Sequence, residues 1–232
     1  MNYQELFQQV QTYTENIFPD TFVELSGGNT STVNVTTQIN TFIEQAEERI
    51  YNTVQIPSLR KNVTGTATTG NPYLACPDNY LSTYSMAIID ADGNYEYLLN
   101  KDVNFIRQSY PNPNATGLPR YYALFGSQYT NLNELAFIMG PTPDANYSVE
   151  LHYFYYPESI VTAGTSWLGD NYDPVLLYGA LVEAYTYMKG EADVLAMYTS
   201  KYQEALAQLK RLGDGLERGD AYRDGQARVK VT

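Results

Sequence analysis

Few residues of this sequence have the type and spacing that catalysis or metal binding requires. His152 is the only histidine, and no second histidine, cysteine or carboxylate follows it at the spacing of a metal site. Cys76, the only cysteine, has no nearby histidine in the sequence to activate it as a nucleophile. The segment 90–94 resembles the beginning of a calcium loop, but its glycine comes too early and the twelfth-position glutamate is missing. We therefore expect a structural or surface histidine, a small buried cysteine and a β-turn, with no enzyme activity, no metal and no cofactor.

The net charge of −12 is distributed unevenly along the chain. Through Leu209 there are eight basic and twenty-two acidic residues, a net charge of −14, whereas the residues after Leu209 carry six basic and four acidic residues, a net charge of +2. An acidic body disfavours a protein that grips nucleic acid, because phosphate contacts need a basic surface. It suits a wall past which DNA slides without binding.

The composition indicates a globular protein. Apolar residues make up 44% of the chain, which is enough to build a core. The N-terminal sequence MNYQELFQQV lacks the basic and apolar regions of a signal peptide, and no run approaches 18 apolar residues, so we expect neither secretion nor a membrane span. The 23 tyrosines are typical of strands and of protein–protein contacts.

Apolar residues at three- and four-residue spacing predict two helices near the N-terminus. The first covers residues 2–15 and ends before Pro19, and the second runs from Val35 to Val54. Residues 24–33 are rich in Gly, Asn, Ser and Thr, so they are expected to form a loop between these helices.

A second pair of helices is predicted over residues 166–213, folded back as a hairpin. Asp173 is expected to be the N-cap of the third helix, with Pro174 in its first turn, and Lys189 with Gly190 is expected to end it. The fourth helix is predicted from Asp193 to Leu212 and closed by Gly213. Their apolar faces are Leu177, Ala180, Leu181, Ala184 and Met188 in the third helix, and Val194, Leu195, Tyr198, Tyr202, Leu206 and Leu209 in the fourth.

Between the helix pairs the sequence favours short strands. Turns that join neighbouring strands into hairpins are predicted at Asp92-Gly93 and at residues 140–145. Residues 148–156 alternate, with Val149 and Leu151 on the face of a half-buried strand. The predicted strands are 61–68, 73–75, 83–89, 94–98, 104–107, 120–125, 135–139 and 147–155.

The predicted fold class is α+β, a four-helix bundle with an inserted antiparallel β domain. The bundle comprises residues 1–58 and 161–213, the β domain residues 59–160 as a sandwich or small barrel, and residues 214–232 an extended C-terminal arm. The simple interpretation of the arm is a solvated tail. The alternative is an arm that orders in a crevice of a partner through charge-assisted hydrogen bonds. The residues expected to bind are Arg218, Tyr222, Arg223 and Arg228.

Several runs of this sequence resemble the adaptor, or head-to-tail connector, proteins of tailed bacteriophages. The strongest is SWLGDNYDPVLLYGALVEAYTYMKGEADVLAMY over residues 166–198. The others are FIEQAEERIY (42–51), PSLRKNVTGTATTGNPYLACPDNYLSTYSMAI (57–88), YEYLLNKDVNFI (95–106), LPRYYALF (118–125), FIMGPTPDANYSVELHYFYYPESI (137–160) and GDAYRDGQAR (219–228).

The resemblance implies a structural virion protein in the neck of the particle, assembled in the cytoplasm of the bacterial host. Twelve copies would form a ring below the portal protein, with a DNA channel through the centre and no specific DNA binding. The helical bundles would pack side by side, and the arm would reach into the portal. The inserted domain would face a tail, nozzle or tail-fibre protein.

Two other functions are alternatives to the adaptor. A carbohydrate- or protein-binding module would use the tyrosine-rich β domain to hold a ligand, with the helices as a mount. A hydrolase would need a catalytic triad or a metal cluster, and the sequence offers neither.

Overall fold

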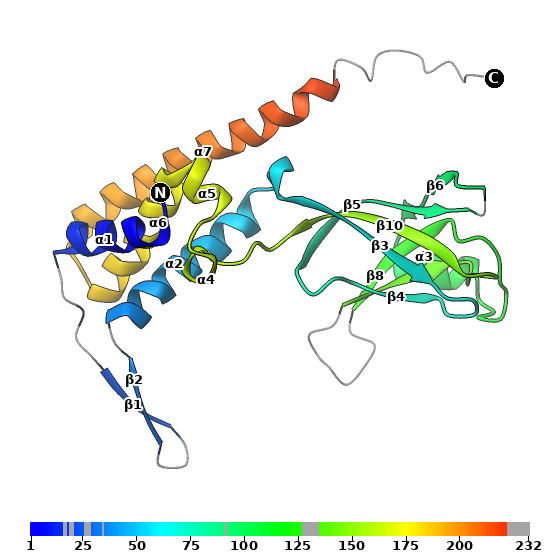
Figure 1. The fold of residues 1–232 in the computed structure, drawn as a ribbon, viewed down its shortest axis with the longest axis horizontal. Helices are drawn as coiled ribbons and strands as arrows, with labels where there is room; N and C mark the ends of the chain where they lie inside the picture. The colour runs from blue at the N-terminus through cyan, green and yellow to red at the C-terminus, as the bar shows by residue number, and fades with distance from the viewer. Residues whose placement is uncertain are drawn as a thin grey trace. The chain divides into compact units, whose positions relative to one another are not determined.

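The computed structural model describes residues 1–15, 18, 21–25, 29–33, 35–90, 92–126 and 135–221. The chain divides into two compact units (Figure 1). The first, the helical unit, comprises residues 1–57 and 157–232, and the second, the β unit, comprises residues 58–156. The two polypeptide links between them lie near residues 57 and 157.

The helical unit is built around one helix, α6 (Asp173–Met188). This helix packs against α1 (Tyr3–Thr14), α2 (Val35–Thr53), α5 (Trp167–Asn171) and α7 (Ala192–Ala221). Because neighbours surround it, apolar residues occupy most of its circumference, as is typical of a buried helix. Its buried residues are Val175, Leu176, Leu177, Gly179, Ala180, Leu181 and Ala184.

Gly179 allows three helices to approach closely. A side-chain carbon at this position would lie 3.1 Å from Cβ of Ala46 on α2 and 3.3 Å from the ring of Tyr202 on α7. These distances are shorter than ordinary van der Waals contacts between carbon atoms. The glycine therefore sets the spacing of α2, α6 and α7.

The N-terminal helix forms where the sequence predicts it. Asn2 caps α1 and accepts a hydrogen bond from the backbone N of Glu5, whose carboxylate accepts one from the backbone N of Asn2. The helix ends at Glu15, which adopts a left-handed conformation. Pro19, the predicted helix stop, lies outside the described residues.

The loop predicted at residues 24–33 is wrong. Residues Thr21–Leu25 form β1 and Asn29–Val33 form β2, and the two strands pair antiparallel. The β-branched residues of these two segments favour strands. The loop signal came from the Gly, Asn, Ser and Thr content of the segment, but Asn29 and the Ser and Thr residues after it belong to β2.

Both helices of the C-terminal hairpin begin or end differently from the prediction. The N-cap of α6 is Tyr172, so Asp173 is the first helical residue and Pro174 the second. Lys189, rather than Gly190, takes the left-handed conformation at the C-terminus, with a φ of 53°. Two short helices, α4 (Ile160–Ala163) and α5, precede the hairpin and were not predicted.

Gly213 does not end the last helix. Helix α7 continues to Ala221, so it includes the first eight residues of the segment predicted as an extended arm. Gly213 is buried, and a side-chain carbon there would lie 3.4 Å from the carbonyl oxygen of Gln55. The glycine therefore lies inside α7, in ordinary contact with the segment after α2, and is not a helix cap.

The described residues of the β unit form two four-stranded sheets. Strands β3, β10, β5 and β6 form one sheet in that order, and β4, β9, β8 and β7 form the other. All pairs are antiparallel except β7 with β8. The strands are β3 (Arg60–Ala67), β4 (Tyr73–Ala75), β5 (Tyr80–Ile89), β6 (Tyr95–Tyr97), β7 (Leu99–Asn100), β8 (Tyr121–Gly126), β9 (Ala136–Gly140) and β10 (Tyr147–Tyr155).

Two predictions about the β unit are wrong. Residues 104–107, predicted as a strand, belong to helix α3 (Val103–Ser109), which Asp102 caps by accepting a hydrogen bond from Asn104 N. The segment 140–145 joins strands of different sheets, so it is not a hairpin turn. A turn signal shows where a strand ends, but it does not show which strand pairs with the next.

The hairpin at Asp92-Gly93 is confirmed by the pairing of β5 with β6.

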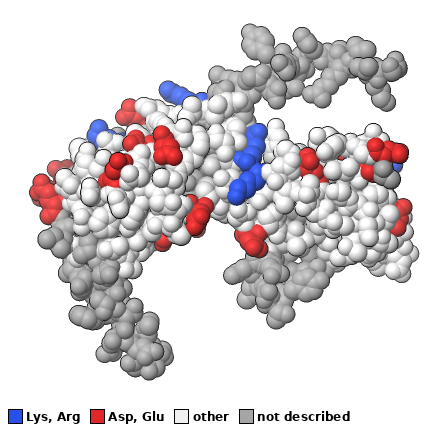
Figure 2. All heavy atoms as spheres, viewed as in Figure 1, with Lys and Arg blue, Asp and Glu red and all other residues white. Residues whose placement is uncertain are grey.

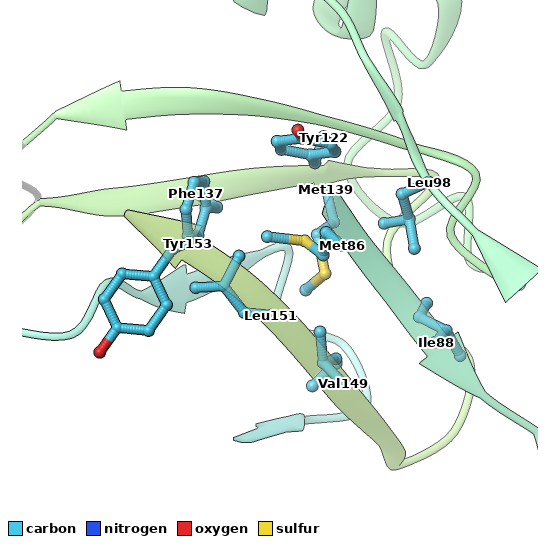
Figure 3. Close-up of a cluster of buried hydrophobic side chains, with 10 residues drawn as sticks. Met86, Ile88, Leu98, Tyr122, Phe137, Met139, Val149, Leu151 and Tyr153 are labelled. Atoms are coloured by element: carbon cyan, nitrogen blue, oxygen red, sulfur yellow. The ribbon is translucent and has the colours of Figure 1, made fainter. Parts of the chain in front are cut away.

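The core of the β unit lies between its two sheets, which form a sandwich rather than a closed barrel (Figure 3). Val149 and Leu151 of β10 point into it, as the alternating pattern predicts, and meet Phe137 and Met139 of the other sheet. The hydroxyl group of Tyr153 points away from this cluster and donates a hydrogen bond to Oδ1 of Asn79 at 3.0 Å. The buried members are Ala67, Met86, Ile88, Leu98, Tyr122, Phe137, Met139, Val149, Leu151 and Tyr153.

Candidate interaction surfaces

The residues that the sequence singles out for chemistry do not assemble into a reactive site. His152 Nε2 lies 3.1 Å from Oε1 of Glu150, two residues away on the same strand. Cys76 is half-buried rather than buried, and loss of solvent raises the pKa of its thiol to about 12, which disfavours a reactive thiolate. Within the described residues, no group of three or more His, Cys, Asp or Glu side chains could hold a metal ion.

The calcium-like segment is a turn, as predicted. The Asp90 carboxylate accepts hydrogen bonds from the backbone N of Asp92 at 2.9 Å and of Asn94 at 2.8 Å. The pKa of Asp90 is lowered from its usual value, mainly by the hydrogen bond from the Asn94 side chain and to a smaller extent by those from backbone N–H groups. Both carboxylate oxygens of Asp90 thus accept hydrogen bonds within the turn.

The predicted portal-binding residues fall at and beyond the end of α7. Arg218 belongs to the last turns of this helix, and its side chain lies outside the described part of the structure. Tyr222, Arg223 and Arg228 lie outside it entirely. Their contact with a partner therefore stays a prediction.

Helix α7 is held to the helical unit by one stripe of side chains. Tyr198, Tyr202, Ala205 and Leu209 are buried at three- and four-residue spacing. The ring of Tyr198 lies 5.0 Å from that of Tyr185 on α6, and burial raises the pKa of its hydroxyl to about 12. This stripe continues to Gly213, where the helix passes the end of α2.

The end of α7 exposes apolar side chains. Leu212 is 41% exposed and Leu216 is 53% exposed, and their four-residue spacing puts them on one side of the helix. Lys210 and Arg211, in the same turn, are exposed as well. The sequence holds a signal for this surface, because the apolar spacing continues through Leu209, Leu212 and Leu216 without a break. Reading Gly213 as a helix end concealed it.

The helical unit carries most of the negative charge. Through Leu209 it has fourteen acidic and three basic residues, a net charge of −11, whereas the β unit has eight acidic and five basic residues, a net charge of −3. Figure 2 shows the acidic side chains of the helices in several separate groups. A surface of this kind repels a polyanion over much of its area.

Among the acidic side chains that the structure describes in the helical unit, that of Glu47 is buried. Glu47 on α2 is 3% exposed, and its Oε1 accepts a hydrogen bond at 3.0 Å from the backbone N of Ile160, the first residue of α4. Burial raises the pKa of this carboxyl, while hydrogen bonds from Ser159 and Ile160 act in the opposite direction. Glu47 therefore fastens the segment that re-enters the helical unit to α2.

A groove of about 380 Å³ lies between α2 and α6. Phe42 and Tyr187 give it an apolar part, since their rings are 5.4 Å apart. Glu183 lines it too and forms an ion pair with Arg49. The groove is mixed in character and open to solvent, so it suits side chains of a protein partner better than a small ligand.

The β unit exposes aromatic side chains. Tyr84 is 54% exposed, and the guanidinium group of Arg60 lies 3.8 Å from the centre of its ring. Tyr97 and Leu99 are 68% and 58% exposed. Exposed aromatic and arginine side chains are enriched at protein interfaces, so this unit has a surface suited to a second partner.

A comparison with known families gives a match that covers nearly the whole chain. The family model described as SU10 adaptor protein matches residues 1–230. A comparison with curated proteins gives no match. None of the described helices is long and apolar enough to cross a membrane.

Proposed function

Because the chain belongs to the SU10 adaptor family, we propose that it is a subunit of the ring that joins the portal of a phage capsid to the tail. Membership in the family makes it a structural adaptor protein of a phage and a component of the virion. The proposal adds the position of the ring, its partners and its role in enclosing part of the DNA channel. The family match over residues 1–230 is the observation that carries it.

The charge distribution supports a place beside DNA. The helical unit has a net charge of −11 through Leu209, and DNA slides past an acidic wall without forming lasting phosphate contacts. In the proposed ring, twelve helical units stand side by side around the channel. No specific DNA contact is needed.

The end of α7 supports contact with the portal. Leu212 and Leu216 are exposed there, as are Lys210 and Arg211 in the same turn. The basic segment 222–232 follows the helix. In the proposed complex the portal covers Leu212 and Leu216 and binds the C-terminal segment. The residues of this chain that contact the portal are then Arg218, Tyr222, Arg223 and Arg228. Many such weak contacts in one ring add by avidity.

The β unit is proposed to face the tail, a nozzle or a tail fibre. Its exposed Tyr84, Tyr97 and Leu99 suit a protein surface. The same tyrosines favour the second candidate function, a carbohydrate-binding module, since aromatic rings also stack on sugars. Glycan-array binding by the intact chain, set against binding to the portal, separates the two.

The test of the proposed function is the mass of the purified chain alone and with the portal protein of its virus. We expect the chain to be a monomer alone and to bind the portal in twelve copies per ring. Two truncations refine the result, one after Gly213 and one after Ala221. Loss of binding in both assigns the portal contact to the last residues, whereas loss only in the first assigns it to the end of α7. A full chain that ignores the portal contradicts the proposal.

A further inference from the structure

The paired strands β1 and β2 form a sheet of their own. No other described strand joins them. A two-stranded sheet is marginally stable in water, because each strand keeps one open edge and two strands cannot build an apolar layer. The sequence of β1, TFVEL, nevertheless contains three apolar residues. An open edge of another sheet would supply the missing hydrogen bonds and neighbours.

Only one open edge in the described β unit is long enough. The end strands of its two sheets are β3, β6, β4 and β7. β6 and β4 have three residues each and β7 has two, whereas β3 has eight. A five-residue strand such as β1 can therefore pair along its whole length only with β3.

The inner face of the sheet is uncovered at β3. Val63 of β3 lies directly opposite Leu151 of β10, so the two side chains share the face that lines the core. Leu151 is 4% exposed, but Val63 is 39% exposed. An additional strand beside β3 would cover this exposed valine.

The charges of the two segments are complementary. β3 begins with Arg60 and Lys61 and contains no acidic residue. Residues 20–33 include Asp20 and Glu24 and no basic residue. Opposite charges across neighbouring strands stabilise the pair and select its register.

We propose that β1 of one copy adds antiparallel to β3 of a second copy, with Glu24 opposite Lys61. This register also puts Phe22 opposite Val63 and keeps all five residues of β1 within residues 60–64 of the partner strand. The occupant is a second copy, because the proposed ring brings identical chains side by side and the acidic β1 of one complements the basic start of β3 in the next. Such a contact joins two different surfaces, so its repetition builds a ring or a filament.

The inference deepens the proposed ring by naming a contact between neighbours, and it rests on that function for bringing copies together. Its test is disulfide formation between two single-cysteine variants, Glu24→Cys and Lys61→Cys, mixed in a Cys76→Ala background. Neither variant can form this bond within one chain. The mixture is oxidised mildly, both on the portal and alone at high concentration, and disulfide-linked pairs are identified by mass.

The matched control is Glu24→Cys mixed with Thr66→Cys. Thr66 lies five residues along β3 from Lys61, about 16 Å away at the rise of a strand, beyond the reach of a disulfide in the proposed register. We expect linked pairs with Lys61→Cys and at least tenfold fewer with Thr66→Cys. Equal yields contradict the register and the proposal.

The remaining outcomes separate this inference from the proposed function. Several copies on the portal without linked pairs overturn the strand addition and leave the adaptor function standing. Linked pairs at high concentration in a chain that does not bind the portal support the strand addition and overturn the function. If neither linked pairs nor portal binding is observed, both the strand addition and the proposed function are overturned. A disulfide that forms only within one chain of the double variant Glu24→Cys/Lys61→Cys would mean that β1 pairs with β3 of the same chain. That outcome overturns the pairing with a second copy.

A charge reversal gives independent evidence. Glu24→Lys and Lys61→Glu should each reduce assembly on the portal, since each places like charges in the proposed pair. The double variant should restore assembly. Two single variants that assemble like the original chain contradict the pairing.

Discussion

Helices α6 and α7 are consecutive in the chain and pack against each other, but they differ in what surrounds them. α6 buries seven of its sixteen residues and contacts four other helices. α7 is thirty residues long and is held by a single stripe that ends at Gly213. Beyond that point it exposes Leu216.

This difference shows which part of the helical hairpin is required for the chain to fold. Every buried residue of α6 contributes to the core of the helical unit, so its sequence follows from the need to bury apolar surface. The last turns of α7 satisfy no such need within the described chain. Exposed leucines at a helix end suit a partner, and the portal is the partner we propose.

The largest effect is expected from Leu181→Ala on α6. Leu181 is fully buried, and removing such a side chain leaves a cavity that costs about 3 kcal/mol of unfolding free energy. Chemical denaturation followed by helix content measures this loss. A change below about 1 kcal/mol would indicate that α6 is not enclosed as the structure describes.

A smaller loss is expected from Gly179→Val, because its side chain would overlap Ala46 and Tyr202. Overpacking of this kind costs about 2 kcal/mol. Ala196→Val is the control on α7, where the residue is exposed, and it should cost about 0.5 kcal/mol or less. Equal losses in the two variants would remove the contrast between the helices.

Gly213→Ala should stabilise the protein. Gly213 lies inside α7, and an added side-chain carbon would make an ordinary contact of 3.4 Å with the Gln55 carbonyl oxygen. Replacing a glycine inside a helix by alanine raises the unfolding free energy by roughly 0.5–1 kcal/mol. The midpoint of thermal unfolding measures the sign. A lower midpoint would favour the helix cap that the sequence alone predicts.

The smallest effect on stability is expected from Leu216→Ser. Because Leu216 is 53% exposed, the unfolding free energy should change by less than about 0.5 kcal/mol. Portal binding should weaken about tenfold, since burying a leucine at an interface contributes about 1.5 kcal/mol or more. Met197→Ser, at a residue 46% exposed near the other end of α7, is the control. Equal binding by both variants and the original chain would contradict a role for the end of α7.

The sequence predicted the four long helices and most strands because their signals are local. The alternation of β10 and the turn at Asp92-Gly93 were readable without any neighbour. Errors arose where a residue type has two uses. Gly213 looked like a helix cap but lies inside α7. Residues 140–145 looked like a hairpin turn but connect strands of different sheets.

The acidic character of the chain, its long helices and its family resemblance can all be read from the amino-acid sequence. These properties depend on composition and on spacing along one segment. Tertiary structure alone decided that α6 is central, that β3 ends a sheet, and that Val63 and Leu216 stay exposed. The physical reason is that burial depends on which segments meet in space, and local periodicity does not contain that information.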